Sequence, residues 1–337
     1  MIIKLGAIGD VIRTTPLSRR LRDKYPDCQI SWITHFPDVL DQRAADRVFR
    51  LDVAAQLYVQ NTEFDMAINL DKELEAGALL QSVQARRKFG FILKQGAIYP
   101  VNAWAEHKYH TGLFDAVSRQ NRKSYVQEIF EIIGEEFQGE EYLLPSLTQA
   151  VESEPDASRT FGDFPASMSE SASDRNPERV TIGLNTGCGG RWPTRLWGDS
   201  NWLDLIAGLR ANGRYHVCLL GGPDEDERNR NLAEQSGAVY PGIFPLRDFM
   251  RVMQTCDVVV TQVTMALHLA VGLRKRVVLL NNIFNKHEFE LYGRGTILEP
   301  EPACECYYAG RCRVQRTCMH DIGVDRVLAA IEALCAI

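Results

Sequence analysis

The stretch that decides the fold is KLGAIGDVIRTTPL, residues 4–17. A short apolar strand, IIKL (2–5), leads through Gly6 and Gly9 into a predicted helix. Glycines permit a tight turn and let a ligand approach the backbone closely, and the N–H groups at a helix start attract anions. This pattern predicts a strand–turn–helix unit of a parallel α/β domain, with a ligand at the end of its first strand.

Asp10, in this turn, has two interpretations. Aspartate is a preferred helix N-cap, and the helical pattern over 10–25 begins at this residue. Alternatively, the carboxylate faces a ligand, which would explain why the loop is so open. A nicotinamide or flavin domain is not expected, because the loop has only G-x-x-G and not G-x-G-x-x-G.

The rest of the chain alternates strand and helix patterns in two series. The predicted strands are 29–35, 65–70 and 88–93, then 179–184, 215–221, 257–261 and 276–281. The predicted helices are 72–85 and 124–134, then 199–211, 225–235, 246–256, 264–273 and 324–335. Apolar strands separated by helices predict parallel sheets covered on both faces. The fold class is therefore α/β, with two Rossmann-like domains facing each other across a cleft.

Between the two series, the chain is rich in Ser, Asp, Glu and Pro and has little periodicity. Such a composition is typical of a linker. The predicted organisation is an N-terminal domain over 1–145, a linker over 146–178 and a C-terminal domain over 179–337. A chain of 337 residues is long enough for two cores.

Composition excludes several classes of protein. The net charge is -6 and the isoelectric point is near 5.7, which argues against a general nucleic-acid binder. No apolar run approaches the roughly 18 residues that span a bilayer. The start, MIIKLGAIGD, lacks the features of a secretory signal. A cytoplasmic protein is expected.

The nine cysteines fit a reduced compartment better than a disulfide framework. Cys218 and Cys256 lie in apolar runs and are predicted to be core residues. A late cluster comprises Cys304, Cys306, Cys312, Cys318 and His320. It lacks the paired C-x-x-C knuckles of a typical zinc site, so both a structural metal and packed or redox-sensitive thiols remain open.

In the second half, the loop NTGCGGRWPTRLWGDSNW (185–202) follows a predicted strand. Its glycines are small, and Arg191 and Arg195 can supply fixed positive charge for a diphosphate. Trp192 and Trp197 are candidates for the core or for the wall of a base pocket.

Two further loops follow strands of the second series. In GGPDEDE, an acidic residue can accept hydrogen bonds from ribose hydroxyls, although acidic residues are also common in a helix first turn. In DVVVTQVTMALHLAVGL, Thr264 to Ala266 begin a predicted buried helix, whose N–H groups suit an anion. His268, on this apolar helix, is expected to be a packed structural histidine.

Together and in this order, these motifs resemble glycosyltransferase family 9, the ADP-heptose:lipopolysaccharide heptosyltransferases and their relatives. The resemblance rests on KLGAIGDVIRTTPL, RWPTRLW, LLGGPDEDERN, TMALHLAVGL, HEFELYGRG and the late TCMHDI, and it covers nearly the whole chain. It implies a GT-B architecture, with the acceptor mainly on the N-terminal domain and the nucleotide sugar mainly on the C-terminal domain.

The resemblance also implies residue roles. Asp10 matches the catalytic base of the family, and Arg195 stands where the family usually has a phosphate-binding lysine. The donor diphosphate would also meet Thr186, Gly187, Thr264, Met265 and Ala266. Glu225 matches the ribose-contacting acid, with Asp226 as the alternative if the register slips by one. No metal and no cofactor are implied.

One residue departs from the family pattern. Many members read Asp-Thr where this chain reads Val263-Thr264, and that aspartate contacts the transferred sugar. Valine cannot accept hydrogen bonds from sugar hydroxyls. The departure weakens heptose as the donor sugar but leaves glycosyl transfer intact.

The expected function is therefore an inverting, metal-independent glycosyltransferase. It would move a sugar, with heptose as one candidate, from a nucleotide diphosphate (ADP favoured) to a glycan of the lipopolysaccharide core or a related surface glycan. A lipid-linked acceptor would bring the protein to the inner face of the membrane as a peripheral protein. The competing hypotheses are a GT-B-shaped sugar-nucleotide epimerase or hydrolase and a noncatalytic nucleotide-sugar-binding protein. The basic residues of 108–125 either meet an anionic acceptor or form a solvated face.

Overall fold

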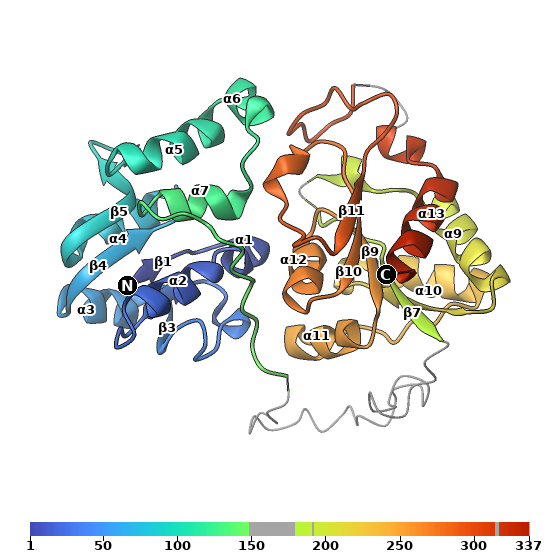
Figure 1. The fold of residues 1–337 in the computed structure, drawn as a ribbon, viewed down its shortest axis with the longest axis horizontal. Coiled ribbons are helices and arrows are strands. Elements are labelled where there is room, and N and C mark those ends of the chain that lie inside the picture. Colours follow the sequence, from blue (N-terminus) through green and yellow to red (C-terminus); the bar gives the residue numbers. More distant parts are fainter. Residues whose placement is uncertain (148–178, 191, 314–316, 337) are drawn as a thin grey trace. The chain divides into compact units, whose positions relative to one another are not determined.

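The computed structural model describes residues 1–147, 179–190, 192–313 and 317–336. These form two compact units (Figure 1). The N-terminal unit comprises Met1–Pro145 together with Asn285–Tyr292, and the C-terminal unit comprises Ser146–Phe284 and Gly293–Ile337. The segment 285–292 thus lies within the C-terminal series in sequence but packs with the N-terminal unit.

The N-terminal unit contains a six-stranded sheet in the order β3-β2-β1-β4-β5-β6. Its strands are β1 (Ile2–Ile3), β2 (Ser31–Thr34), β3 (Arg47–Arg50), β4 (Glu63–Asn69), β5 (Gln84–Lys94) and β6 (Ala97–Pro100). All neighbouring strands are parallel except β5 and β6, which form a hairpin. Gln95 and Gly96, between them, both have positive φ, which matches the twist of a two-residue hairpin turn.

The helices of this unit are α1 (Ile8–Ile12), α2 (Pro16–Lys24), α3 (Val53–Gln60), α4 (Leu74–Ser82), α5 (Glu106–Leu113), α6 (Asp115–Gln120) and α7 (Tyr125–Glu131). The segment 285–292 adds the short 3₁₀ turn η6 (Lys286–Glu288), which packs against α7.

The single helix predicted over 10–25 is wrong, because α1 and α2 are separate. Pro16 has no N–H and begins α2 as its first residue. The hydroxyls of Thr14 and Thr15 bond instead to the carbonyl oxygens of Val11 (2.8 Å) and Ile12 (2.6 Å). These local bonds replace helical ones and let the chain turn between the two helices.

The C-terminal unit contains a five-stranded, fully parallel sheet in the order β11-β10-β9-β7-β8. Its strands are β7 (Val180–Asn185), β8 (Tyr215–Leu220), β9 (Val258–Gln262), β10 (Arg276–Leu280) and β11 (Gly295–Leu298). Its helices are α9 (Asp199–Ala211), α10 (Asp226–Ser236), α11 (Leu246–Gln254), α12 (Met265–Gly272) and α13 (Val324–Cys335). The 3₁₀ turns η4 (Pro193–Arg195) and η5 (Pro223–Glu225) follow β7 and β8. Within this unit, α12 lies on one side of the sheet and α9 and α13 on the other (Figure 1).

The strands of the C-terminal sheet read as apolar runs because both of their faces are covered. Side chains of β7, β9 and β10 form one core with α9 and α13. The predicted helices 199–211 and 324–335 coincide with α9 and α13. Cys218 and Cys256 are buried, as predicted.

Five elements of the N-terminal unit and one of the C-terminal unit lacked a clear sequence signal, namely β3, β6, α3, α5 and α6, and β11. β3, for example, is RVFR, an edge strand whose two arginines are exposed. The predicted linker falls almost entirely on residues 148–178, which lie outside the described part of the chain. No helix of the described residues is long and apolar enough to cross a membrane.

Candidate functional site

The first strand of the N-terminal unit, β1, lies inside its sheet, between β2 and β4. The strand order reverses here, and in open parallel sheets ligands bind beyond the carboxyl ends of the strands at such a point. Lys4 Nζ lies 3.1 Å from Asp71 Oδ2, joining the segments that follow β1 and β4. The same carboxylate oxygen accepts the N–H groups of Leu5 (2.9 Å) and Gly6 (3.3 Å). A buried ion pair therefore fixes the turn that leads into α1.

Lys4 and Asp71 are only 3% and 8% exposed. Burial disfavours the charged form of Lys4, but Tyr125, Asp10 and Asp71 outweigh burial and raise the pKa of Lys4 above its ordinary value. Lys4 therefore remains an ammonium group throughout the neutral range. Its charge contributes to the electrostatic field at Asp10.

Asp10 lies in α1, directly after this turn. The N-cap of α1 is Ala7, so the interpretation of Asp10 as a helix cap is wrong. Its side chain is 33% exposed, and Oδ1 lies 2.8 Å from Arg13 Nη2. The guanidinium of Arg13 lies 3.5 Å from the centroid of the Tyr125 ring, and Arg13 Nη1 is 3.7 Å from Glu288 Oε2. Asp10 is thus a partly exposed carboxylate held by a nearly buried cation.

In the C-terminal unit the strand order reverses at β7, which lies between β9 and β8. Asn185 ends β7, and its Nδ2 donates to Thr261 Oγ1 (3.2 Å), Thr264 Oγ1 (3.4 Å) and the carbonyl oxygen of Gly187 (3.2 Å). The two threonine hydroxyls lie 3.3 Å apart. A network of neutral groups therefore joins the loop after β7 to the start of α12.

The helix start predicted at Thr264 to Ala266 is confirmed. Thr264 is the N-cap of α12, and its Oγ1 accepts the N–H of Ala266 at 3.1 Å. That N–H was expected to point at an anion, and in this structure it bonds to the cap. Met265 is the first residue of the helix, and the half-buried Val263 precedes the cap. The role of these residues in binding a diphosphate stays a prediction.

Glu225 ends η5, and its Oε2 accepts the N–H of Gly222 at 2.9 Å. A Cβ at Gly187 would lie 1.9 Å from Glu225 Oε1, so the loop after β7 can approach Glu225 only because residue 187 is a glycine. The adjacent Thr186 is buried and donates to Asn229 Oδ1 at 2.6 Å. The structure therefore brings together three residues that the sequence analysis assigned to donor binding.

The alternative ribose contact, Asp226, is the first residue of α10. Its two oxygens accept bonds from Arg230 Nε (3.0 Å) and the Tyr240 hydroxyl (2.9 Å). Since Glu225 packs against the loop after β7 and Asp226 bonds within its own helix and to Tyr240, the geometry favours Glu225 over Asp226.

Arg195 ends η4 and is 6% exposed. Its Nε donates to the carbonyl oxygen of Trp192 at 3.3 Å, and its Nη2 donates to the carbonyl oxygen of Cys188. The guanidinium lies 5.4 Å from the ring centroid of Trp192 and 5.5 Å from that of Phe284. Arg195 thus ties the loop after β7 to η4, and diphosphate binding by it stays a prediction. Arg191 lies outside the described residues.

Other candidates divide between core and surface. Trp197 is fully buried and donates to the carbonyl oxygen of Ile322 at 2.9 Å, so it belongs to the core. His268 is 7% exposed, in keeping with a packed histidine.

In the late cluster, Cys306 Sγ and Cys312 Sγ are 4.0 Å apart. Among the described residues, no group of three or more His, Cys, Asp or Glu side chains could hold a metal ion.

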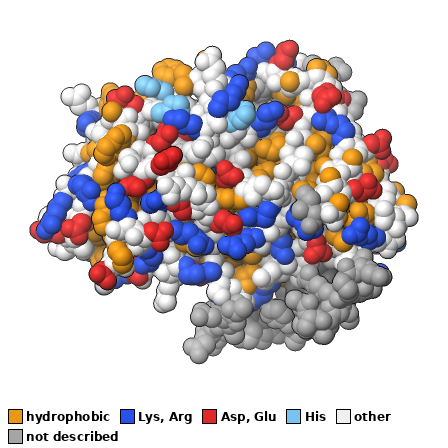
Figure 2. All heavy atoms as spheres, viewed as in Figure 1, with side chains coloured by type: hydrophobic (Ala, Val, Ile, Leu, Met, Phe, Trp, Pro, Cys, Tyr) orange, Lys and Arg blue, Asp and Glu red, His pale blue; other side chains and the backbone are white. Residues whose placement is uncertain are grey.

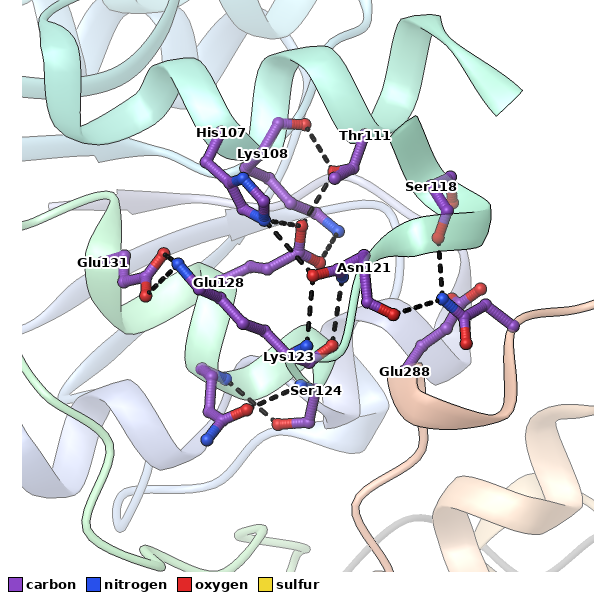
Figure 3. Close-up of polar contacts among 12 residues, drawn as sticks. His107, Lys108, Thr111, Ser118, Asn121, Lys123, Ser124, Glu128, Glu131 and Glu288 are labelled. Carbon is purple, nitrogen blue, oxygen red and sulfur yellow. Dashed lines mark hydrogen bonds and ion pairs between the residues drawn. The ribbon is translucent and has the colours of Figure 1, made fainter. Parts of the chain in front are cut away.

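Two basic residues of 108–125 form ion pairs on the N-terminal unit (Figure 3). Lys108 Nζ lies 2.6 Å from Glu128 Oε2, and Lys123 Nζ lies 2.7 Å from Glu131 Oε1. The second pair, whose side chains are both more than one-third exposed, favours the solvated-face interpretation for Lys123, whereas Lys108 and Glu128 form a mostly buried pair. Figure 2 shows acidic and basic side chains interspersed over the visible face of the molecule.

Sequence reasoning missed Lys4, Arg13, Asp71 and Glu288. Asp71 had a usable signal, because an acidic residue directly after the predicted strand 65–70 lies at the same sheet edge as the turn after β1. Glu288 lies in the motif HEFELYGRG, but nothing in the sequence indicated its partner, because it is more than 270 residues from Arg13 and only folding brings the two together.

Several solved structures of glycosyltransferases have a fold similar to that of this chain. A glycosyltransferase family 9 protein from Veillonella parvula DSM 2008 is 16% identical, with a TM-score of 0.68 and 99% and 96% of the two chains covered. The ADP-heptose lipopolysaccharide heptosyltransferase II of E. coli is 15% identical, with a TM-score of 0.65 and 99% and 98% covered. E. coli heptosyltransferase WaaC with ADP-2-deoxy-2-fluoro heptose is 16% identical, with a TM-score of 0.60 and 98% of each chain covered. A search of curated protein sequences gave no match.

The two parallel sheets and these likenesses define a GT-B fold of the glycosyltransferase type. The family model of glycosyltransferase family 9 (heptosyltransferase) matches residues 54–296, more than half of the chain. The chain belongs to this family and is a glycosyltransferase.

Proposed function

We propose that the protein transfers a sugar from a nucleotide diphosphate to a glycan of the lipopolysaccharide core or a related surface glycan, with inversion and without a metal. The single observation that carries this proposal is the carboxylate of Asp10. It is one-third exposed, lies beyond the carboxyl end of β1 where the strand order reverses, and is held by Arg13. Membership of the family supports the reaction class, and the position of Asp10 supports its proposed role as the base.

In the proposed reaction, an acceptor hydroxyl attacks the anomeric carbon of the donor sugar and Asp10 takes the hydroxyl proton. A carbon–oxygen bond forms to the acceptor, and the bond between the anomeric carbon and the diphosphate breaks. The electron pair leaves with the nucleoside diphosphate. Attack opposite the leaving group inverts the configuration at that carbon.

The nucleotide is proposed to bind at the strand ends of the C-terminal unit. The diphosphate would meet the loop at Thr186 and Gly187 and the start of α12, where hydroxyl and amide groups gather. Glu225 would accept bonds from the ribose. An ADP-sugar is the favoured donor, since E. coli heptosyltransferase WaaC and a second heptosyltransferase of similar fold, TibC, have been solved with ADP-sugars.

The test begins with calorimetry of ADP, UDP, GDP and their sugars on the wild type and on Asp10→Asn. We expect one nucleotide to bind both proteins equally. Transfer to a lipopolysaccharide-core acceptor should fall about 10²–10⁴-fold in Asp10→Asn, the range for loss of a general base. Asp65→Asn is the matched control, because Asp65 belongs to the same unit and its side chain is 85% exposed.

Each part of the proposal has its own readout. NMR of donor and product reports whether the anomeric configuration inverts. Chelator treatment and elemental analysis test metal independence, because the similar E. coli glycosyltransferase TibC is iron-containing (TM-score 0.56, 12% identity, with 99% of this chain and 75% of that chain covered). Free sugar or an epimer formed without acceptor would instead support the hydrolase or epimerase hypothesis. Nucleotide binding without turnover of any kind would support a noncatalytic binding protein.

A further inference from the structure

We propose that Arg13 and Glu288 are positioning residues that set the orientation and the basicity of Asp10. This inference rests on the proposed function of Asp10 as a base. Three charged groups form a chain in the N-terminal unit: Asp10 Oδ1 to Arg13 Nη2 at 2.8 Å, and Arg13 Nη1 to Glu288 Oε2 at 3.7 Å. Because different nitrogens of one guanidinium face the two carboxylates, Arg13 can hold Asp10 while Glu288 offsets part of its charge.

Arg13 has little freedom to leave this position. Its side chain is 12% exposed, and its guanidinium is stacked on the Tyr125 ring at 3.5 Å. Glu288 is similarly enclosed, with a side chain that is 15% exposed. A buried cation is stable only where nearby carboxylates balance its charge. Glu288 therefore helps to keep the Arg13 guanidinium in position beside Asp10, and Asp10 helps to keep it beside Glu288.

Glu288 is brought to Arg13 by an anchor at the start of its segment. Asn285 Nδ2 donates to the carbonyl oxygens of Ser118 (2.7 Å) and Asn121 (2.8 Å), at the end of α6. Figure 3 shows Glu288 on the segment that this anchor fixes, near Ser118 and Asn121. At the other end of the segment, the Tyr292 hydroxyl donates to the carbonyl oxygen of Glu140 at 2.8 Å. The segment 285–292 is thus held at both ends, and it places the carboxylate of Glu288 beside the guanidinium of Arg13, which pairs with Asp10.

Other titratable groups also face Asp10. Lys4 after β1, Tyr125 on α7 and Tyr142 after α7 each have a pKa that responds to the charge of Asp10. Burial raises the pKa of Tyr125 to about 12, so it is neutral where a carboxylate titrates. Lys4, whose pKa is raised above its ordinary value, stays charged over that range, so neither Tyr125 nor Lys4 changes state while Asp10 titrates.

The proposal makes two predictions of opposite sign. In Arg13→Met, Asp10 loses its neighbouring positive charge, so its titration midpoint should move to higher pH by about one unit. In Glu288→Gln, the charge of Arg13 is no longer offset, so the midpoint should move to lower pH by a few tenths of a unit. Arg13→Lys should restore most of the wild-type midpoint, because it keeps the charge.

The measurement is ¹³C NMR of the side-chain carboxyl groups against pH, with Asp10→Asn to assign the signal. Glu131→Gln is the matched control for Glu288→Gln, because it removes one acid from the same unit at the Lys123 pair and should leave Asp10 unmoved. With the donor that calorimetry selects, the acidic limb of kcat against pH should move in the same two directions.

The proposal would be overturned if the titration midpoint of Asp10 stayed within about 0.2 pH unit of the wild-type value in both variants. This threshold is about one fifth of the effect expected for Arg13→Met. Shifts of the same sign in both variants would also overturn it, because a general loosening of the fold would act alike in each. If the signals move as expected but Asp10→Asn transfers sugar normally, the positioning stands and the proposed base is wrong.

Discussion

The strand ends of the two units are built from different groups. In the N-terminal unit the turn after β1 is held by charges, with the buried pair Lys4–Asp71 and the pair Asp10–Arg13. In the C-terminal unit the first residues of the corresponding turn after β7 are held by neutral groups, with the amide of Asn185 and the hydroxyl of Thr264 among them, and the buried guanidinium of Arg195 ties the loop further along to η4. Both lie where the strand order of a parallel sheet reverses.

This difference teaches what each turn can do. Fixed opposite charges hold a carboxylate in one place and set its affinity for a proton. Neutral donors beside small glycines let a charged ligand approach the backbone, and the guanidinium of Arg195 adds a fixed positive charge to the same loop. The N-terminal turn is thus suited to moving a proton, and the C-terminal turn to binding an anion.

The largest effect is expected when the buried ion pair Lys4–Asp71 of the N-terminal unit is broken. Asp71→Asn leaves the ammonium of Lys4 buried without its counter-charge and weakens the bonds to the N–H groups of the turn. We expect the free energy of unfolding of this unit to fall by about 3–5 kcal/mol, measured by urea denaturation.

The control for that prediction is Asp65→Asn, whose pair with Arg86 is more than four-fifths exposed and should contribute almost nothing. The double variant Lys4→Met/Asp71→Leu sharpens the comparison. If it is as unstable as Asp71→Asn, the turn needs the pair itself and not merely the absence of an unpaired charge.

A second prediction concerns Lys72, whose pKa is lowered to about 8 by burial first and then by Lys108. The unfolded chain therefore binds more protons than the folded one between about pH 8 and 10.5, and stability should rise with pH over that window. Lys72→Met should stabilise the protein by about 2 kcal/mol at pH 7, and this gain should vanish as the pH approaches about 10.5. Thermal melts at a series of pH values measure it, and a gain independent of pH would contradict the assignment.

The third prediction disturbs the C-terminal turn without removing a charged group. In Gly187→Ala the new Cβ would lie 1.9 Å from Glu225 Oε1, so Glu225 must move and lose its bond to Gly222. Nucleotide affinity should fall about tenfold or more, which corresponds to roughly 1.4 kcal/mol. Gly190→Ala is the control, because a Cβ there meets nothing within 4 Å. Calorimetry that finds the two variants alike would remove Glu225 and Gly187 from the donor site.

The smallest expected effect is at the surface of the N-terminal unit. Lys123 and Glu131 form a pair whose side chains are 43% and 37% exposed. Lys123→Ala should change the free energy of unfolding by less than about 1 kcal/mol. A larger loss of acceptor affinity than of stability would show that Lys123 contacts an anionic acceptor and is not only part of a solvated face.

Much of this molecule follows from short-range pattern. The apolar runs 179–184 and 276–281 could only be buried strands, and the helices α9 and α13 match their predicted limits. The helix over 10–25 failed because Pro16 and the two threonines before it carry a local signal to turn, which the amphipathic pattern concealed. The cap interpretation of Asp10 failed with it, since the helix begins two residues earlier than the pattern suggests.

The sequence by itself determined the fold class, the alternation of strands and helices in two series, the family and residues that end several strands, because these depend on periodicity and on motifs a few residues long. Only the tertiary structure decided the partners of those residues. Asp71 meets Lys4 across two parallel strands, and Glu288 meets Arg13 because the segment 285–292 packs with the N-terminal unit. The charge balance around a buried group depends on distances in space, and these distances cannot be deduced from separation along the chain.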